Sequence, residues 1–319
     1  MKLVAIHAGE LIALSVASLW GLASIIWTKV GETIPAVEMN LIKAVLASGL
    51  MLAAILIGGI GLAGVPVEGM LLLAASGAVG IAIGDTALFA AFQRIGPTRT
   101  QLIKLLSPPL VSLVALASLQ EQLSPGMLGG VVVTVLGIFL VMSERMPHDP
   151  VSRHSFWEGV GLGLLSSLAE VVGVVLSRGV LARTSIDPAW SALLRLASAG
   201  VLAWLWMALT HQKIGGWLPK ILLTEGTDDP PAQSRSHLNS RQRLALLITA
   251  GVVCGTFVGL WLQQIALKIT AAGVAQTLFA TSPLFILLIL AVVERKPPSL
   301  RALLGILVAI GGVALLFVG

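Results

Sequence analysis

The sequence contains very little charge. Aspartate, glutamate, lysine and arginine together make up 11% of its 319 residues, whereas an average globular chain contains about 25%. Hydrophobic residues make up 56%, and the mean hydropathy is +0.97. This composition excludes an ordinary soluble protein and predicts that most of the chain lies in lipid.

Other residue types and patterns are also scarce. Cys254 is the one cysteine, so the chain cannot form an internal disulfide. The 20 basic and 15 acidic residues contain no long run of like charge, so nucleic acid is not expected as a partner. The five histidines lie at or beyond the ends of the apolar segments, and no glycine-rich nucleotide motif is present. We therefore expect neither a metal nor a cofactor.

Long apolar segments are abundant. A bilayer core about 30 Å thick needs roughly 20 apolar residues per helix, and the chain contains ten segments of about that length. Each is continuously apolar, whereas a membrane barrel needs strands of alternating polarity. We therefore predict an all-α membrane protein with ten transmembrane helices. Their predicted ranges are 9–28, 36–58, 69–92, 98–119 and 126–143 in the first half, and 157–177, 189–210, 244–267, 273–293 and 302–318 in the second.

The two halves of the chain resemble each other when one is shifted by 175 positions. Five spans per half is an odd number, so the second copy must enter the membrane in the opposite sense, as an inverted repeat. We expect one repeat over 1–147 and one over 148–319, with 211–243 as a polar surface loop. The matching residues are Gly84 with Gly259, Gln101 with Gln276, Ser107 and Pro108 with Ser282 and Pro283, Gly130 with Gly305, and Gly137 with Gly312, while Glu121 and Glu294 end the fourth span of each half with a slip of two residues.

Five charged residues interrupt the predicted spans: Lys43, Asp85, Lys104, Glu170 and Arg195. Each costs at least about 2.5 kcal/mol at the centre of a membrane helix, so all are candidates for function. The excess of one positive charge favours an anionic or zwitterionic substrate. The alternative is that Asp85 pairs with Lys104 and Glu170 with Arg195 only to hold the helices together.

Lys43 and Arg195 occupy similar places, eight and seven residues after Pro35 and Pro188. The two basic residues either bind a carboxylate or phosphate of the substrate together, or each satisfies an acid on a neighbouring helix. The sequence leaves both interpretations open.

Glu170 is surrounded by small residues. A carboxyl in hydrocarbon favours its neutral form, so this residue is a candidate for binding and releasing protons. The small residues leave room for a substrate or let another helix approach closely. At helical spacing they are Gly163, Ser166, Ser167, Gly173 and Ser177.

Further polar and aromatic residues are candidates for lining the substrate site. Gln101 and Gln276 are expected to face each other across the axis that relates the repeats, or else to hydrogen-bond neighbouring helices. Gln263 adds polar lining at helical spacing. Trp20 and Trp261 are the tryptophans that we consider for the site rather than for the lipid interface.

Residues 168–178, LAEVVGVVLSR, resemble the first helix of the small multidrug resistance family, in which a single membrane glutamate binds protons and cationic drugs alternately. The whole chain is similar to the ten-helix EamA-type carriers of the drug/metabolite transporter superfamily. This resemblance implies a substrate cavity between the halves and alternating access. The first half departs from the pattern because Gly21 stands near the place of Glu170.

Orientation is open. Outside Lys43 and Arg195, fourteen basic residues fall on one predicted face and four on the face of the termini, which predicts that the termini lie away from the cytoplasm. The resemblance implies the opposite.

We predict a secondary active transporter in the cell (inner) membrane that moves a small organic metabolite or amphipathic compound. Coupling to protons through Glu170 is one hypothesis, and a proton-independent exchanger of organic anions is the alternative. An integral-membrane enzyme would need clustered His, Asp or Ser near an interface, and a scaffold would have little reason to keep charges in lipid. The expected partners are the substrate, the bilayer and protons, with the chain as a monomer or a homodimer joined through its glycine-rich helices.

Overall fold

The computed structural model describes residues 7–62, 65–144, 152–212, 215, 240–294 and 299–318. The described residues form helices and no strands, and nine of these helices are long and apolar enough to cross a membrane, with 125–141 as a shorter tenth. The predicted all-α fold with ten spans is therefore confirmed. Residue 147, where the predicted halves meet, lies outside the described residues, as do 213, 214 and 216–239 of the predicted polar loop.

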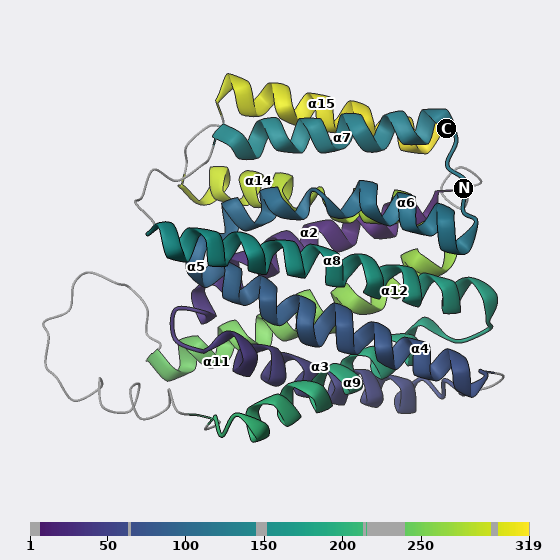
Figure 1. Cartoon of the computed structure of the whole chain (residues 1–319), viewed down its shortest axis with the longest axis vertical. Helices are drawn as coiled ribbons and strands as arrows, with labels where there is room; N and C mark the ends of the chain where they lie inside the picture. The colour runs from purple at the N-terminus through teal and green to yellow at the C-terminus, as the bar shows by residue number, and fades with distance from the viewer. Residues whose placement is uncertain are drawn as a thin grey trace, which may run out of the picture.

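The elements of the two halves follow the same order, except that α5 of the first half contains two helices joined at Gly96, which correspond to α12 and α13 of the second (Figure 1). The first half contains α2 (Ala8–Val30), α3 (Ala36–Ile57), α4 (Val67–Gly77), η1 (Ala78–Ile83), α5 (Gly84–Lys104), α6 (Ser107–Leu119) and α7 (Pro125–Glu144). The second contains α8 (Arg153–Arg183), α9 (Pro188–Leu209), α11 (Ser240–Ala250), η2 (Gly251–Val258), α12 (Gly259–Ile269), α13 (Ala272–Phe279), α14 (Ser282–Glu294) and α15 (Leu300–Val318).

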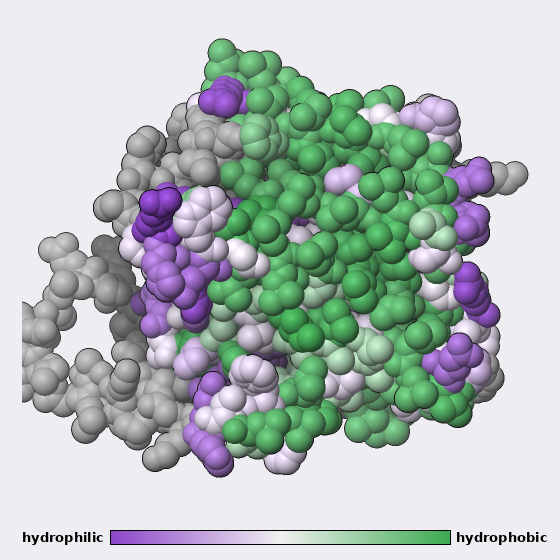
Figure 2. Space-filling model, in the orientation of Figure 1, coloured by the Kyte–Doolittle hydropathy of each residue, from purple (hydrophilic) through white to green (hydrophobic). Residues whose placement is uncertain are grey.

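The bundle has two ends. We call the end where α2 begins and α15 ends the termini face; the turns 120–124 and 184–187 lie there too. The opposite end, with the turn 31–35, is the loop face. A hydrophobic belt covers the surface between them, and hydrophilic residues gather at both ends (Figure 2). This distribution is that of a multi-pass integral membrane protein.

The glycines that match between the repeats pack the two halves together. A Cβ added to Gly130 would lie 2.9 Å from the carbonyl oxygen of Gly312, and one on Gly305 would lie 2.9 Å from that of Gly137. Helices α7 and α15 therefore approach backbone to backbone, side by side in Figure 1. These matched glycines are used for contacts within one chain.

Two π-helical segments, η1 and η2, interrupt the third span of each half. They lie at matching places, because each is followed directly by a glycine of the matched pair Gly84 and Gly259. The spacing of apolar residues did not predict them. A π-helix frees backbone carbonyls from their usual partners, and such segments are frequent at functional sites.

The fourth span of each half is broken rather than continuous. In the first half α5 ends at Lys104 and α6 begins at Ser107; in the second, α13 ends at Phe279 and α14 begins at Ser282. The break precedes the matched Ser-Pro pairs because proline fits the first turn of a helix but not its interior. Each interruption is two residues long, Leu105 and Leu106 in the first half and Ala280 and Thr281 in the second.

Buried apolar side chains fill the bundle toward the termini face. This cluster draws on helices of both halves and leaves its members almost fully shielded. Its best-buried members include Ala13, Val16, Val111, Ala115, Val174, Ala266, Leu267, Ala275 and Leu278.

Candidate functional site

A cavity of about 1020 Å³, counting its open mouth, lies between the two halves. Several lining residues are aromatic, namely Trp20, Trp27, Phe89, Phe92 and Phe279. Seven of the ten residues predicted for the site line the cavity: Trp20, Lys43, Asp85, Gln101, Lys104, Glu170 and Gln276.

The cavity opens toward the loop face. A second hollow of about 530 Å³ shares Trp27, Phe89 and Phe92 with it and extends to Gly31 and Glu32. Glu32 is exposed and belongs to the turn at the loop face. A solute entering from that face would therefore meet the three shared aromatic side chains first.

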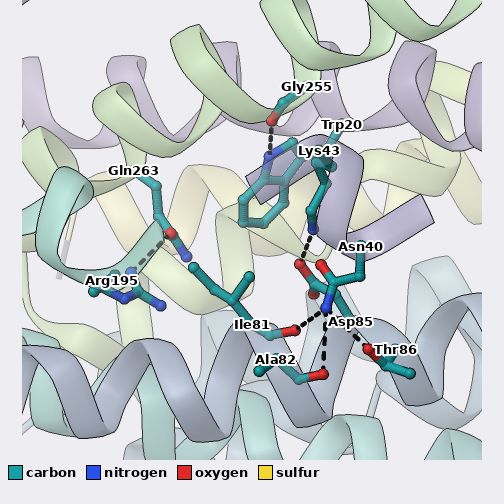
Figure 3. Close-up of polar contacts among 10 residues, drawn as sticks. All are labelled: Trp20, Asn40, Lys43, Ile81, Ala82, Asp85, Thr86, Arg195, Gly255 and Gln263. Atoms are coloured by element: carbon teal, nitrogen blue, oxygen red, sulfur yellow. Dashed lines mark hydrogen bonds and ion pairs between the residues drawn. The ribbon is translucent and has the colours of Figure 1, made fainter. Parts of the chain in front are cut away.

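Lys43 and Asp85 form the first ion pair of the cavity wall (Figure 3). Lys43 Nζ donates a hydrogen bond to Asp85 Oδ2 and lies 5.1 Å from the centre of the Phe89 ring. The Lys43 side chain is 6% exposed and that of Asp85 is 30% exposed, so the acid has the better access to cavity water. The pair lies at the beginning of α5, just after η1.

Lys104 and Glu170 form the second ion pair, with 3.0 Å between Nζ and Oε2. Ser107 also donates a hydrogen bond to Glu170 Oε2, at 3.0 Å. The alternative pairing considered from the sequence, of Asp85 with Lys104 and Glu170 with Arg195, is therefore wrong. The partners differ because Lys43 on α3 lies closer to Asp85 than sequence spacing could indicate.

The small residues around Glu170 serve helix packing. A Cβ on Gly173 would lie 2.9 Å from Gly80 Cα, and one on Gly163 would lie 3.0 Å from the Ile103 side chain. Neither glycine lines the cavity. Of the two interpretations of this stripe, close approach of helices is the one that the geometry supports, and it brings Glu170 up to the cavity wall.

Arg195, Gln263 and Trp261 do not line the cavity. Arg195 is 3% exposed, and its Nη1 donates to Gln263 Oε1 at 3.3 Å (Figure 3). Trp261 packs against the Phe257 ring, with 5.8 Å between the ring centres. Arg195 and Gln263 thus form a buried group behind the wall, and Trp261 belongs to the surrounding apolar packing.

Trp20 and Gln276, both predicted for the site, differ in their hydrogen bonding. Trp20 Nε1 donates to the carbonyl of Gly255 in η2 at 3.1 Å. Gln276 is 2% exposed, and its Oε1 has no hydrogen-bond partner among the described residues. Gln276 therefore presents an unused acceptor beside the cavity.

Sequence reasoning missed Asn40 and four aromatic residues. Asn40 is fully buried, and its Nδ2 donates to the carbonyls of Ile81 and Ala82 in η1 and to Thr86 Oγ1 (Figure 3). An asparagine within a predicted span was a signal that could have been used. The phenylalanines were not predicted to line the site, although Phe89 and Phe92 share a helical face with Asp85.

Polar contacts close the termini face across the two halves. Arg178 Nε lies 2.6 Å from Glu121 Oε1, and its Nη1 donates to the carbonyls of Leu267 and Lys268 at 2.7 and 2.9 Å. Glu121 Oε2 accepts a hydrogen bond from the Ala272 backbone at 2.8 Å. We call these residues the termini-face latch. Glu121 comes from the first half and the rest from the second, so the latch joins the halves.

Comparisons with known proteins agree with this architecture. The family described as the EamA-like transporter family matches residues 7–143 and 157–318. One solved structure, titled only "Crystal structure of protein", is similar over 98% of this chain and 97% of its own, with a TM-score of 0.71 and 17% identical residues. At that identity the likeness concerns the fold alone. No curated protein matches the sequence.

Proposed function

The chain belongs to the EamA-like transporter family of the drug/metabolite superfamily, and from this premise we propose that it is a secondary active transporter working by alternating access. Its substrate is a small organic metabolite or amphipathic compound held in the cavity between the halves. The family is one of transporters, not of enzymes.

One observation carries the proposal: the cavity is open toward one membrane face and sealed toward the other. The loop face leads through Trp27, Phe89 and Phe92 to the charged wall. The termini face is sealed by the buried apolar cluster and by the termini-face latch. A carrier needs two such states, and the inverted repeat supplies the second by exchanging the roles of the halves.

Glu170 couples transport to protons in this proposal. Protonation removes the negative charge of Glu170 and with it the attraction to Lys104, whose Nζ lies 3.0 Å away. Lys104 is then released to bind an acceptor group of the substrate. The proton and the substrate thus act on the same ion pair, which links their movements.

The test is proton-driven uptake in vesicles by Glu170→Gln. A thermal-shift screen with amino acids, organic anions and cationic dyes first identifies a transported compound. We expect Glu170→Gln to abolish uptake driven by a pH gradient while exchange of the compound across the vesicle membrane continues. Glu158→Gln is the matched control on the same helix, because Glu158 pairs with Arg94 away from the cavity. Full proton-driven uptake by Glu170→Gln would refute the coupling role.

A proton-independent exchanger of organic anions is the second candidate. The excess positive charge around the site favours it, since Lys43, Lys104 and Arg195 outnumber Asp85 and Glu170. An exchanger would carry the compound at the same rate with and without a pH gradient, and Glu170→Gln would then leave the pH response unchanged.

We also propose that the protein resides in the cell (inner) membrane as a monomer or homodimer, with repeats over 1–147 and 148–319 as the moving units. A reporter fused to the C-terminus decides between the orientation predicted by the lysine and arginine count and the one that the family implies. Light scattering of the detergent-purified protein distinguishes the monomer from the dimer.

A further inference from the structure

Arg195 is a buried cation without an acid. The residue is 3% exposed, its Nε has no hydrogen-bond partner, and no carboxylate among the described residues lies within ion-pair distance of it. Among the described residues, the Arg195 side chain makes one hydrogen bond, from Nη1 to Gln263 Oε1 at 3.3 Å. A buried, unpaired charge is costly, so its presence makes Arg195 a candidate for function.

The repeat shows which partner is missing. Lys43 and Arg195 are each the eighth residue of their helix, because α3 begins at Ala36 and α9 at Pro188. The acid that pairs with Lys43 is Asp85, the residue directly after Gly84 at the end of η1. The corresponding residue of the second half, directly after Gly259 at the end of η2, is Leu260. The first half therefore holds a complete ion pair and the second holds its cation alone.

Arg195 lies directly behind the cavity wall. A Cβ on Gly80 would lie 3.6 Å from Arg195 Nη2, which places the guanidinium against η1. The next residues along η1 and α9, Ile81 and Leu196, both line the cavity, as does Leu260. Asp85 and Glu170 line it as well.

The charge balance of this region favours one extra negative charge. Lys43 with Asp85 and Lys104 with Glu170 each sum to zero. Arg195 leaves an excess of one positive charge, which is not screened by water because the residue is buried. Arginine pairs well with a carboxylate because its planar guanidinium donates two parallel hydrogen bonds.

We propose that the substrate of this carrier is an organic carboxylate whose anionic group pairs with Arg195, in the place where the second half lacks an acid. The inference rests on the proposed transport function and names the substrate class for its cavity. Ile81, Leu196 and Leu260 line the cavity and Arg195 does not in the state described here, so the pair forms as the cavity wall rearranges during alternation. The apolar body of the substrate lies against the aromatic lining.

Binding of three probes with one shape and different charge tests the proposal. Phenylacetate, phenylacetamide and phenethylamine are titrated against the purified full chain in detergent, with tryptophan fluorescence and thermal unfolding as readouts. We expect the chain to bind phenylacetate at least about tenfold more tightly than phenylacetamide, since hydrogen bonds to charged groups are worth about 1.5 to 3 kcal/mol. Arg195→Gln removes this preference, and Arg195→Lys keeps part of it.

Leu260→Asp and Leu260→Asn form the decisive pair of variants. Aspartate supplies the missing acid to Arg195, so Leu260→Asp loses the preference for phenylacetate and unfolds at a higher temperature than Leu260→Asn. Asparagine has the same shape without the charge, so Leu260→Asn keeps a preference for the anion although its wall is more polar. This comparison also holds if Arg195→Gln fails to fold.

Two results would overturn the proposal. One is equal or absent discrimination between phenylacetate and phenylacetamide by the unaltered chain up to millimolar concentration. The other is an undiminished anion preference in Leu260→Asp. Flux of compounds in vesicles tests the transport function separately. If either result occurs and a neutral or cationic compound still crosses the membrane, the chain remains a transporter. If no compound screened crosses the membrane, the transport function itself is refuted.

Discussion

Lys43 and Asp85 do not depend on each other equally, because water reaches them to different degrees. The Lys43 side chain is 6% exposed and the Asp85 side chain 30%. Removal of the acid leaves a lysine ammonium almost without water, whereas removal of the lysine leaves a carboxylate that is partly hydrated from the cavity. Uncompensated buried charge is the costly case.

We therefore predict that Asp85→Asn destabilises the protein more than Lys43→Met does. Loss of one partner of a buried pair costs about 3 to 5 kcal/mol, and the loss for Lys43→Met is expected to be smaller because Asp85 stays hydrated. Unfolding in detergent measures both. Combination of Lys43→Met with Asp85→Leu is expected to restore most of the stability. A larger loss for Lys43→Met than for Asp85→Asn contradicts this account.

At the residue scale the sequence indicated which charged side chains line the cavity better than it indicated their partners. Charges in hydrocarbon are rare and costly, so Lys43, Asp85, Lys104 and Glu170 could be identified without a structure. Their pairing depends on how the helices rotate and cross, and spacing along the chain does not contain that information. Asn40 escaped notice because it is uncharged, although it holds three polar groups in place.

At the element scale, the two π-helical segments are each supported by a donor from another helix. Asn40 on α3 donates to the carbonyls of Ile81 and Ala82 in η1 at 2.8 and 3.2 Å. Trp20 on α2 donates to the carbonyl of Gly255 in η2. These carbonyls lie where water is scarce, so an unmatched one carries a desolvation cost.

Asn40→Ala is expected to destabilise the protein by about 1 to 3 kcal/mol, because it leaves buried acceptors of η1 without a donor. Ser48→Ala on the same helix is the control, since the Ser48 hydroxyl has no hydrogen-bond partner and its removal is expected to cost little. Unfolding in detergent compares the two. An equal effect of both substitutions would show that Asn40 does not support η1.

The positions of the spans followed from the sequence, and the breaks within them did not. A continuous apolar run sets the length of a membrane helix but contains no signal for a π-helical turn. The Ser-Pro pairs at 107–108 and 282–283 mark where the second helix of each fourth span begins. The interruption between α5 and α6, and between α13 and α14, depends on how neighbouring helices satisfy the freed backbone groups.

At the scale of the whole molecule, the inverted repeat predicts a second latch. Arg178 lies eight residues after Glu170, and Lys29 lies eight residues after Gly21, its counterpart. Glu121 and Glu294 likewise end the fourth span of each half. Lys29 pairs here with Glu32 of its own half at 2.8 Å, as expected when the loop face is open. The helix ends that carry Lys29 and Glu294 are therefore expected to approach each other when that face closes.

The architecture at this scale was the most predictable feature of the protein. Odd numbers of spans, matched glycines and matched Ser-Pro pairs were enough to indicate an inverted repeat before any coordinates were known. The direction in which the cavity opens was not predictable, because a symmetric pattern favours both states alike. It depends on contacts such as the termini-face latch, which differ between the two ends in the state described here.

We predict that Arg178→Gln shifts the protein toward the state closed at the loop face. The substitution removes the ion pair with Glu121 and two hydrogen bonds to the carbonyls of Leu267 and Lys268. These contacts stabilise the state closed at the termini face. When they are lost, the state closed at the loop face gains population. A Lys29→Cys, Glu294→Cys pair should then cross-link faster in the Arg178→Gln background than without it.

Distances between spin labels at both ends of the bundle test the central claim most directly. On a Cys254→Ser background, labels at the exposed positions Gln122 and Ser185 report on the termini face, and labels at Thr33 and Arg301 report on the loop face. Each pair joins the two halves. Alternating access predicts that Arg178→Gln lengthens the distance at the termini face and shortens the distance at the loop face. The fraction of molecules that changes should be the same at both ends. Distances that stay unchanged at both ends, or that lengthen together, would contradict it.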